Sequence, residues 1–70
     1  MEVFKLKEGE EYIQLNNLLK TLCWVATGGE AKIIIKQEEV FVNGDIETQI
    51  RRKIRQGDTV TMEDDQCRIE

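Results

Sequence analysis

The densest group of side chains that could do chemistry in this 70-residue sequence lies between residues 48 and 56. This segment holds four of the ten Lys and Arg residues and none of the fourteen Asp and Glu residues; its basic residues are Arg51, Arg52, Lys53 and Arg55. Arginine presents a planar fork of donors to phosphate oxygens, and lysine acts as a mobile point charge. The net charge of −4 does not exclude a polyanionic partner, because binding follows the local potential. We predict a phosphate-binding face here; the alternative is a solvated strand edge that resists aggregation.

The sequence lacks the side chains on which most enzymatic chemistry depends. It has no histidine, which removes the commonest general base and the commonest metal ligand. No nucleophile stands beside a base, and there is no glycine-rich phosphate loop. Glu63-Asp64-Asp65 could offer oxygens to a hard cation, but three acids without further ligands are typical of a turn. We therefore expect no catalytic residue, no metal, no cofactor and no small-molecule substrate.

Length and composition favour one small domain over residues 1–70. The sequence is 40% hydrophobic and 34% charged, which suits a compact domain with a thin core. No apolar run approaches the roughly 20 residues of a membrane-spanning helix, and the N-terminus does not resemble a signal peptide. Cys23 and Cys67 are expected to be reduced and largely buried, which favours the cytoplasm. We expect a monomer that does not bind membranes.

The first part of the chain predicts a strand and a helix. Residues 2–7 alternate between polar and apolar types, with Phe4 and Leu6 on one face. The acids that follow suit the start of a helix, where the dipole favours negative charge. We expect this helix at about residues 11–22. Its apolar stripe, at helical spacing, consists of Leu15, Leu18, Leu19 and Leu22.

A capping box predicts the second helix. The Thr27 hydroxyl can accept the N–H of Glu30, while the Glu30 carboxylate accepts the N–H of Thr27. The helix should run from there to about Gln37. Its core positions are Ala31, Ile34 and Ile35, and its outer face carries Lys32 and Lys36.

After residue 39 the apolar period changes to that of strands. Asn43-Gly44 is a strong signal for a two-residue hairpin, because both residue types tolerate a positive φ. We expect strands at 40–42, 45–50, 59–62 and 66–70, separated by turns at 43–44, 56–58 and 63–65. If the basic stretch is extended, Arg51 and Lys53 share one face and Arg52 lies opposite.

This order of elements is an α+β arrangement, with two helices packed on a small, mostly antiparallel sheet. A strand at each end of the chain predicts that the two ends pair, which would cover edges of the sheet.

Three motifs, in this order, resemble the S4 RNA-binding domain. Thr27-Gly28-Gly29-Glu30-Ala31-Lys32 is similar to the start of that family's second helix, Val40-Phe41-Val42-Asn43-Gly44 to its hairpin, and Gly57-Asp58-Thr59-Val60 to its closing turn. The resemblance covers residues 14–58, about two-thirds of the chain. Glu47-Thr48, followed by Arg51 and Lys53-Ile54, is similar to the small stand-alone bacterial S4-domain proteins. It implies an S4-like (αL) fold and non-catalytic binding of structured RNA, of ribosomal or transfer RNA type.

The resemblance also implies which residues would contact RNA. The family commonly opens its first helix with Arg-Leu-Asp, where this chain has Gln14-Leu15-Asn16, and the arginine expected near the second helix start is Gly28. Two usual phosphate or base contacts are therefore replaced. The stand-alone group shares this glycine, so we interpret the surface as a variant one. The expected RNA contacts are Gln14, Asn16, Thr27, Gly28, Gly29, Lys32, Lys36, Arg51, Arg52, Lys53 and Arg55.

Some of these residues have simpler interpretations. Gly28 and Gly29 leave helix N–H groups open to an anion, but they suit a tight helix entry equally well. Lone helix lysines such as Lys36 are usually only solvated, whereas Lys32 lies in the motif. Trp24 could stack on an unpaired base, but a lone tryptophan after a helix more often covers a small core. Tyr12 is expected to pack near the start of the first helix.

Two other function classes stay open. A ubiquitin-like sulfur carrier also combines a Val-Asn-Gly hairpin with a late Gly-Asp turn, but it needs a C-terminal Gly-Gly, and this chain ends Cys67-Arg68-Ile69-Glu70. A protein-interaction adaptor would bind a basic partner with its acidic surface and would differ in salt dependence. DNA is a further alternative, because phosphate contacts alone do not choose between sugars.

Overall fold

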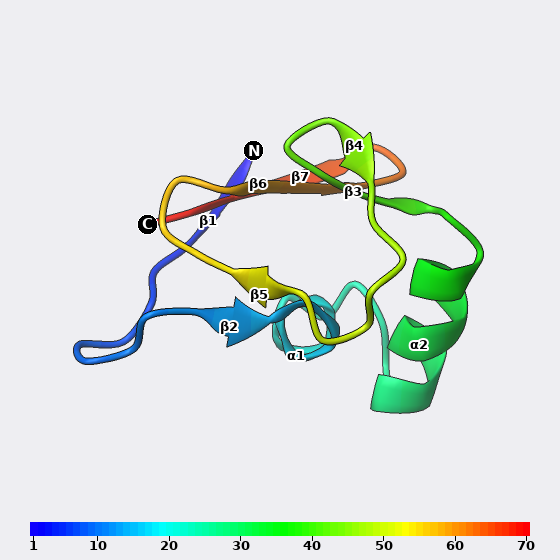
Figure 1. The fold of residues 1–70 in the computed structure, drawn as a ribbon, viewed down its shortest axis with the longest axis horizontal. Coiled ribbons are helices and arrows are strands. Elements are labelled where there is room, and N and C mark those ends of the chain that lie inside the picture. Colours follow the sequence, from blue (N-terminus) through cyan, green and yellow to red (C-terminus); the bar gives the residue numbers. More distant parts are fainter.

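The computed structural model describes all 70 residues, and they form a sheet layer with a helical layer beneath it (Figure 1). The elements are β1 (Glu2–Phe4), β2 (Ile13–Gln14), α1 (Leu15–Thr21), α2 (Gly28–Lys36), β3 (Val40–Val42), β4 (Asp45–Ile46), β5 (Lys53–Ile54), β6 (Thr59–Met62) and β7 (Asp65–Ile69). Five strands form one sheet in the order β1-β7-β6-β3-β4, and β2 pairs with β5 in a separate two-stranded ribbon. Only β1 and β7 run parallel. The predicted α+β class, with two helices and a mostly antiparallel sheet, is confirmed.

The two ends of the chain lie side by side. β1 pairs with β7 from Glu2 opposite Cys67 to Phe4 opposite Ile69. Beyond the strands, the N–H of Leu6 donates to the carbonyl of Glu70 and the N–H of Glu70 donates to that of Phe4, each at 2.8 Å. Both ends therefore lie on the same side of the molecule (Figure 1), and one edge of β7 is covered by the chain itself.

The first helix is shorter than predicted. It begins at Leu15, not near residue 11, and ends at Thr21. Residues 13 and 14 are extended instead and pair with Ile54 and Lys53 of β5. The preceding acids lie in a turn with Gly9 at φ 89°, where Glu10 accepts the N–H of Lys7 at 2.9 Å. The prediction was wrong here because acids suit a helix start and a turn alike, and only the pairing with β5 decides between them.

The second helix follows the predicted cap closely. The Thr27 hydroxyl oxygen accepts the N–H of Glu30 at 3.1 Å. The return bond differs from the prediction, since the Glu30 carboxylate accepts the N–H of Ala26 at 3.3 Å rather than that of Thr27. Ala31 and Ile35 are fully buried. Neither helix is long and apolar enough to cross a membrane.

The core lies between the helices and the sheet. Its thirteen buried apolar residues include Leu15, Leu18 and Leu19 of the predicted stripe. Trp24 packs against this core, as predicted, and its Nε1–H donates to the Glu2 carboxylate at 2.8 Å. Cys67 is buried, but Cys23 is exposed, contrary to prediction. Cys23 lies after the end of α1, where the backbone has left the helix and adopts φ 61°.

The return strand predicted for residues 45–50 is confined to β4, Asp45 and Ile46. The N–H of Glu47 still donates to the carbonyl of Val40 at 2.9 Å, after which the chain leaves the sheet. It crosses to α1, where the carbonyls of Arg52 and Ile50 accept the N–H groups of Leu15 and Asn16 at 2.8 and 3.0 Å. The first N–H groups of a helix have no partner within it. The crossing chain supplies those partners, which is why the strand stops early.

Candidate nucleic-acid interface

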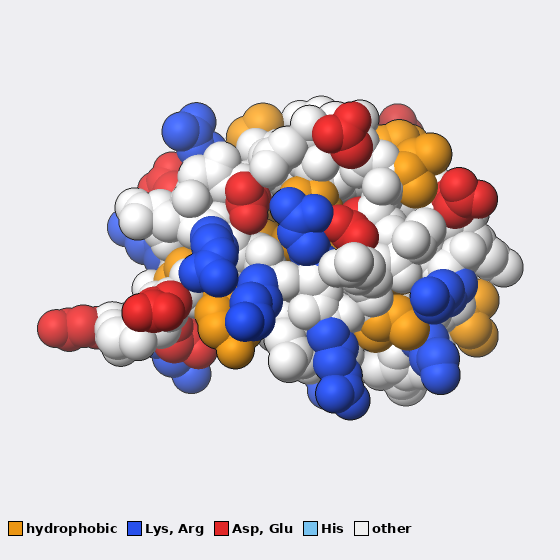
Figure 2. Space-filling model, viewed as in Figure 1, with side chains coloured by type: hydrophobic (Ala, Val, Ile, Leu, Met, Phe, Trp, Pro, Cys, Tyr) orange, Lys and Arg blue, Asp and Glu red, His pale blue; other side chains and the backbone are white.

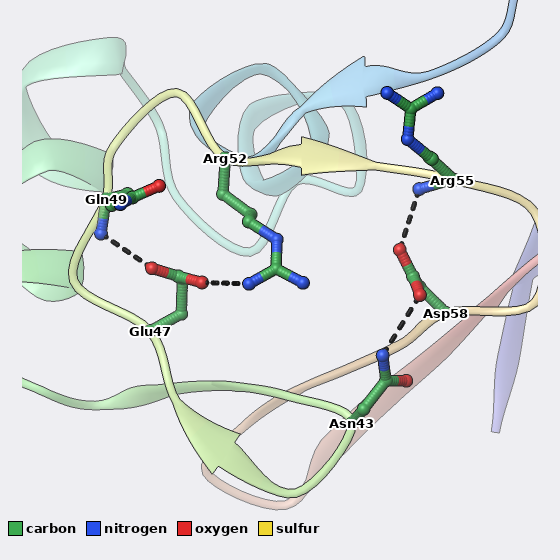
Figure 3. A network of polar contacts seen from close by, with 6 residues as sticks. All are labelled: Asn43, Glu47, Gln49, Arg52, Arg55 and Asp58. Carbon is green, nitrogen blue, oxygen red and sulfur yellow. Dashed lines mark hydrogen bonds and ion pairs between the residues drawn. The ribbon is translucent and has the colours of Figure 1, made fainter.

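The loop that precedes β5 is organised around one buried carboxylate, that of Glu47 (Figure 3). One of its oxygens accepts the N–H of Gln49 at 2.9 Å, and the other accepts the Arg52 guanidinium at 2.5 Å. The Glu47 side chain is 11% exposed and that of Arg52 is 42% exposed. Burial alone would raise the pKa of the Glu47 carboxyl, but the bonds from Gln49 and Arg52 outweigh it and lower the pKa. Glu47 is therefore charged at neutral pH and holds the loop in shape.

The far end of β5 is fixed by a second set of polar bonds, between Asn43 and Asp58 (Figure 3). The Asn43 amide donates to the Asp58 carboxylate at 3.0 Å and accepts the N–H of Thr59 at 2.9 Å. Asp58 in turn accepts the N–H of Arg55 at 2.8 Å. The hairpin and the Gly-Asp turn, fifteen residues apart at these side chains, are thus parts of one connection. It sets where β5 ends.

Two anchors therefore hold the chain around β5: the Glu47 carboxylate on one side and the Asn43–Asp58 pair on the other. The basic side chains between them point in different directions. Arg51 and Arg52 lie at a turn rather than in a strand. The extended backbone that would place Arg51 and Lys53 on one face is therefore absent before residue 53. Arg52 points inward to Glu47, whereas Arg55 projects away from Asp58 beside β2 (Figure 3). The Lys53 Nζ lies 5.0 Å and the Arg55 Cζ lies 5.6 Å from the centre of the Tyr12 ring. Lys53 is therefore grouped with Arg55.

The candidates on the helices are less constrained. Lys32 and Lys36 are exposed on α2. A Cβ at Gly28 would meet nothing within 4 Å, and one at Gly29 would meet only the Thr27 hydroxyl at 3.8 Å, so packing does not require glycine at either position. The Glu30 carboxylate is bonded at this same helix start.

The two polar residues at the start of α1 have different surroundings. Gln14 lies opposite Lys53 in the two-stranded ribbon. Asn16 is partly buried, and its Oδ1 is enclosed without a hydrogen-bond partner. Of the two, Gln14 is the one placed beside a basic side chain.

Figure 2 shows the surface that results. Lys and Arg side chains form a band across this face, over β5 and on toward the helices, while acids occupy the tip of the turn before β2. The molecule has no pocket, and the band is an open surface. The band consists of exposed basic residues in the turn before β5, on β5, directly after it and on α2: Arg51, Lys53, Arg55, Lys32 and Lys36.

Sequence reasoning did not assign two residues that organise this surface. Glu47 was noted within a motif, but nothing in the sequence showed that its carboxylate would be buried against Arg52. Tyr12 was expected to pack near the start of the first helix, but its position beneath Lys53 and Arg55 was not predicted. The pairing of β2 with β5 brings Tyr12 to these residues, and that pairing was not predicted.

Comparison with known proteins identifies the class to which this chain belongs. The S4 domain family matches residues 4–70, and the chain belongs to that family. A 50-residue stretch is 42% identical to the Escherichia coli (strain K12) protein named "Putative RNA-binding protein YbcJ" and covers 71% of each chain. The Shigella flexneri "Uncharacterized protein YbcJ" matches with the same identity and coverage.

A solved structure agrees with the family match. The solution structure of YbcJ from E. coli superposes with a TM-score of 0.74 and 35% identity, covering 99% of this chain and 86% of that one. That structure is described as revealing an αL motif involved in RNA binding. The predicted S4-like (αL) fold is confirmed.

Proposed function

We propose that this protein binds structured RNA through the basic band formed by β5, the turn before it and the exposed side of α2, and that it does so without covalent chemistry. The observation that carries the proposal is the placement of Lys53 and Arg55 together on one side of a ribbon fixed at both ends. Membership of the S4 family and the αL motif described for YbcJ support RNA as the partner.

An open basic surface suits folded RNA for a physical reason. The deep groove of an RNA duplex excludes side chains, so duplex RNA is contacted through phosphates, 2′-hydroxyls and shape. Exposed arginine and lysine side chains on a surface without a pocket match those targets. We propose a monomer in the cytoplasm that binds ribosomal or transfer RNA.

The basic residues have unequal roles in this proposal. Arg51, Lys53 and Arg55 are the principal phosphate contacts, because they lie close together in sequence around β5 and their charged ends, unlike that of Arg52, form no ion pair. Arg52 has a supporting role, since its guanidinium is shared with Glu47. Lys32 and Lys36 extend the contact along α2, with Gln14 at the edge of β2.

The test is a titration of labelled structured RNA at several salt concentrations. If about four phosphates are neutralised, log K should fall with log salt at a slope of about −3. The variant Arg51→Ala/Lys53→Ala should flatten this slope by about one to two units. The matched control is Lys5→Ala/Arg68→Ala, which removes two exposed charges outside the band and should leave the slope near its wild-type value.

Two outcomes would contradict the proposal. If wild-type protein does not bind RNA at low salt, a protein partner for the acidic surface becomes the better explanation. If both double variants weaken binding equally, the attraction is non-specific and the band is not the site. A DNA duplex of the same sequence, titrated in parallel, should bind more weakly because it lacks 2′-hydroxyls and the A-form shape.

A further inference from the structure

The two-stranded ribbon has a buried face and an outer face. Ile13 and Ile54 are paired, with Ile54 fully buried and Ile13 packed against the core. Because successive side chains in a strand alternate between faces, the neighbours of this pair lie on the outer face. Gln14 lies there opposite Lys53. Tyr12 lies directly before β2 and Arg55 directly after β5, on the other side of the Ile13–Ile54 pair.

Tyr12 contacts both basic side chains of the outer face, those of Lys53 and Arg55. Both cations lie over its ring, at 5.0 Å for the Lys53 Nζ and 5.6 Å for the Arg55 Cζ. A cation within about 6 Å of a ring centre is attracted by the negative charge of the ring face. Lys53 and Arg55 lie two residues apart, so their like charges would otherwise favour separation.

Arg55 is held at its backbone as well as at its side chain. The Asp58 carboxylate accepts its N–H at 2.8 Å, and its carbonyl accepts the N–H of Asp58 at 3.0 Å. Figure 3 shows its guanidinium directed beside β2 and away from this bond. The exposed end of Arg55 is therefore placed by the Tyr12 ring and its backbone by Asp58.

Ordering long basic side chains costs conformational entropy when a ligand binds, and side chains that are ordered beforehand avoid part of this cost. A cation resting on a ring face keeps N–H donors that point away from the ring. We propose that the outer face of the β2–β5 ribbon is a preformed contact for RNA phosphates, in which Tyr12 is the positioning residue for Lys53 and Arg55. This inference rests on the proposed function and deepens it.

The experiment compares two substitutions of Tyr12 in two backgrounds. Tyr12→Leu removes the aromatic face and keeps every charge, so the affinity for structured RNA should fall about threefold to tenfold while the salt slope stays the same. Tyr12→Phe keeps the ring face and should bind within about twofold of wild type. In the background Lys53→Gln/Arg55→Gln, Tyr12→Leu should cause no further loss, because the cations it positions are gone.

A second readout measures the positioning itself, in the absence of RNA. The side-chain methylene protons of Lys53 and Arg55 should show ring-current shifts in the NMR spectrum of the wild type and of Tyr12→Phe. These shifts should disappear in Tyr12→Leu. Thermal melting followed by Trp24 fluorescence shows whether each variant is folded.

The possible failures can be told apart. If wild type binds with the expected salt slope but Tyr12→Leu leaves the affinity unchanged or raises it, this inference alone is wrong. If Tyr12→Leu weakens binding equally in both backgrounds, Tyr12 contacts the RNA directly, as a stacking platform for a base, and does not act through the cations. If wild type binds no RNA, the proposed function fails and this inference fails with it.

Discussion

The basic residues of the β5 region and those of α2 differ in how their side chains are held. Near β5, Arg52 forms the one ion pair of the structure, with Glu47, and Lys53 and Arg55 lie over Tyr12. On α2, Lys32 and Lys36 are exposed and form neither kind of contact. The two regions carry the same sign of charge, but only in the first are basic side chains, those of Arg52, Lys53 and Arg55, held by contacts with other residues. We expect the β5 region to determine where RNA binds, and α2 to supply attraction that adapts to it.

The largest expected effect comes from removing the anchor of the first region. Glu47→Ala should lower the free energy of unfolding by about 2 kcal/mol, because it leaves Arg52 and the N–H of Gln49 without their charged partner. Urea unfolding followed by Trp24 fluorescence measures this loss. The control is Glu39→Ala, an exposed acid for which we expect a change within about 0.5 kcal/mol. Equal losses in the two variants would show that Glu47 is not an anchor.

A smaller loss is expected at the other end of β5. Asn43→Ala should lower the free energy of unfolding by about 1–2 kcal/mol. It removes the hydrogen bonds to Asp58 and Thr59, and it leaves alanine, whose side chain has no polar group, at φ 53°. Asn43→Gly removes the same bonds but tolerates this backbone conformation. The difference between the two variants therefore measures the backbone part of the effect. If Asn43→Gly is as unstable as Asn43→Ala, the backbone conformation contributes nothing to the loss.

Two double variants that remove equal charge test whether the β5 region contributes more to RNA binding than α2 does. Lys53→Gln/Arg55→Gln should weaken RNA binding about tenfold, because it removes positioned contacts. Lys32→Gln/Lys36→Gln should weaken it by no more than about threefold, because solvated lysines give up more freedom when they bind. Both are measured by the same RNA titration at one salt concentration. A reversed order would make α2 the principal contact.

The smallest effect expected is a dependence of stability on pH. The pKa of Glu47 lies below its ordinary value of 4.5 in the folded protein, so its stabilising contribution is complete above that value. It is lost as pH falls through the folded-state pKa, where both states become protonated. The stability difference between wild type and Glu47→Gln should therefore shrink between neutral pH and strongly acidic pH. Urea unfolding at a series of pH values measures it, and a constant difference would contradict the prediction.

Local patterns were sufficient for much of the fold. The Thr27 cap, the hairpin at Asn43-Gly44 and the strand at 59–62 depend on residues that are neighbours in sequence, and each was predicted close to its observed place. The start of α1 and the end of β4 were not predicted at their observed places. Both depend on the chain between β4 and β5 crossing to the helix, where Ile50 and Arg52 supply carbonyls to its first N–H groups.

The candidate site divides in the same way. The sequence by itself determined that four basic residues lie together in a short segment free of acids, since this is a property of composition along the chain. Only the tertiary structure decided which of them face outward. Arg52 turns inward because Glu47 is buried beside it, and Lys53 and Arg55 turn outward together because β2 brings Tyr12 to them. The charge is a property of each residue. The direction of each side chain depends on contacts with residues that are distant in sequence and meet only when the chain folds.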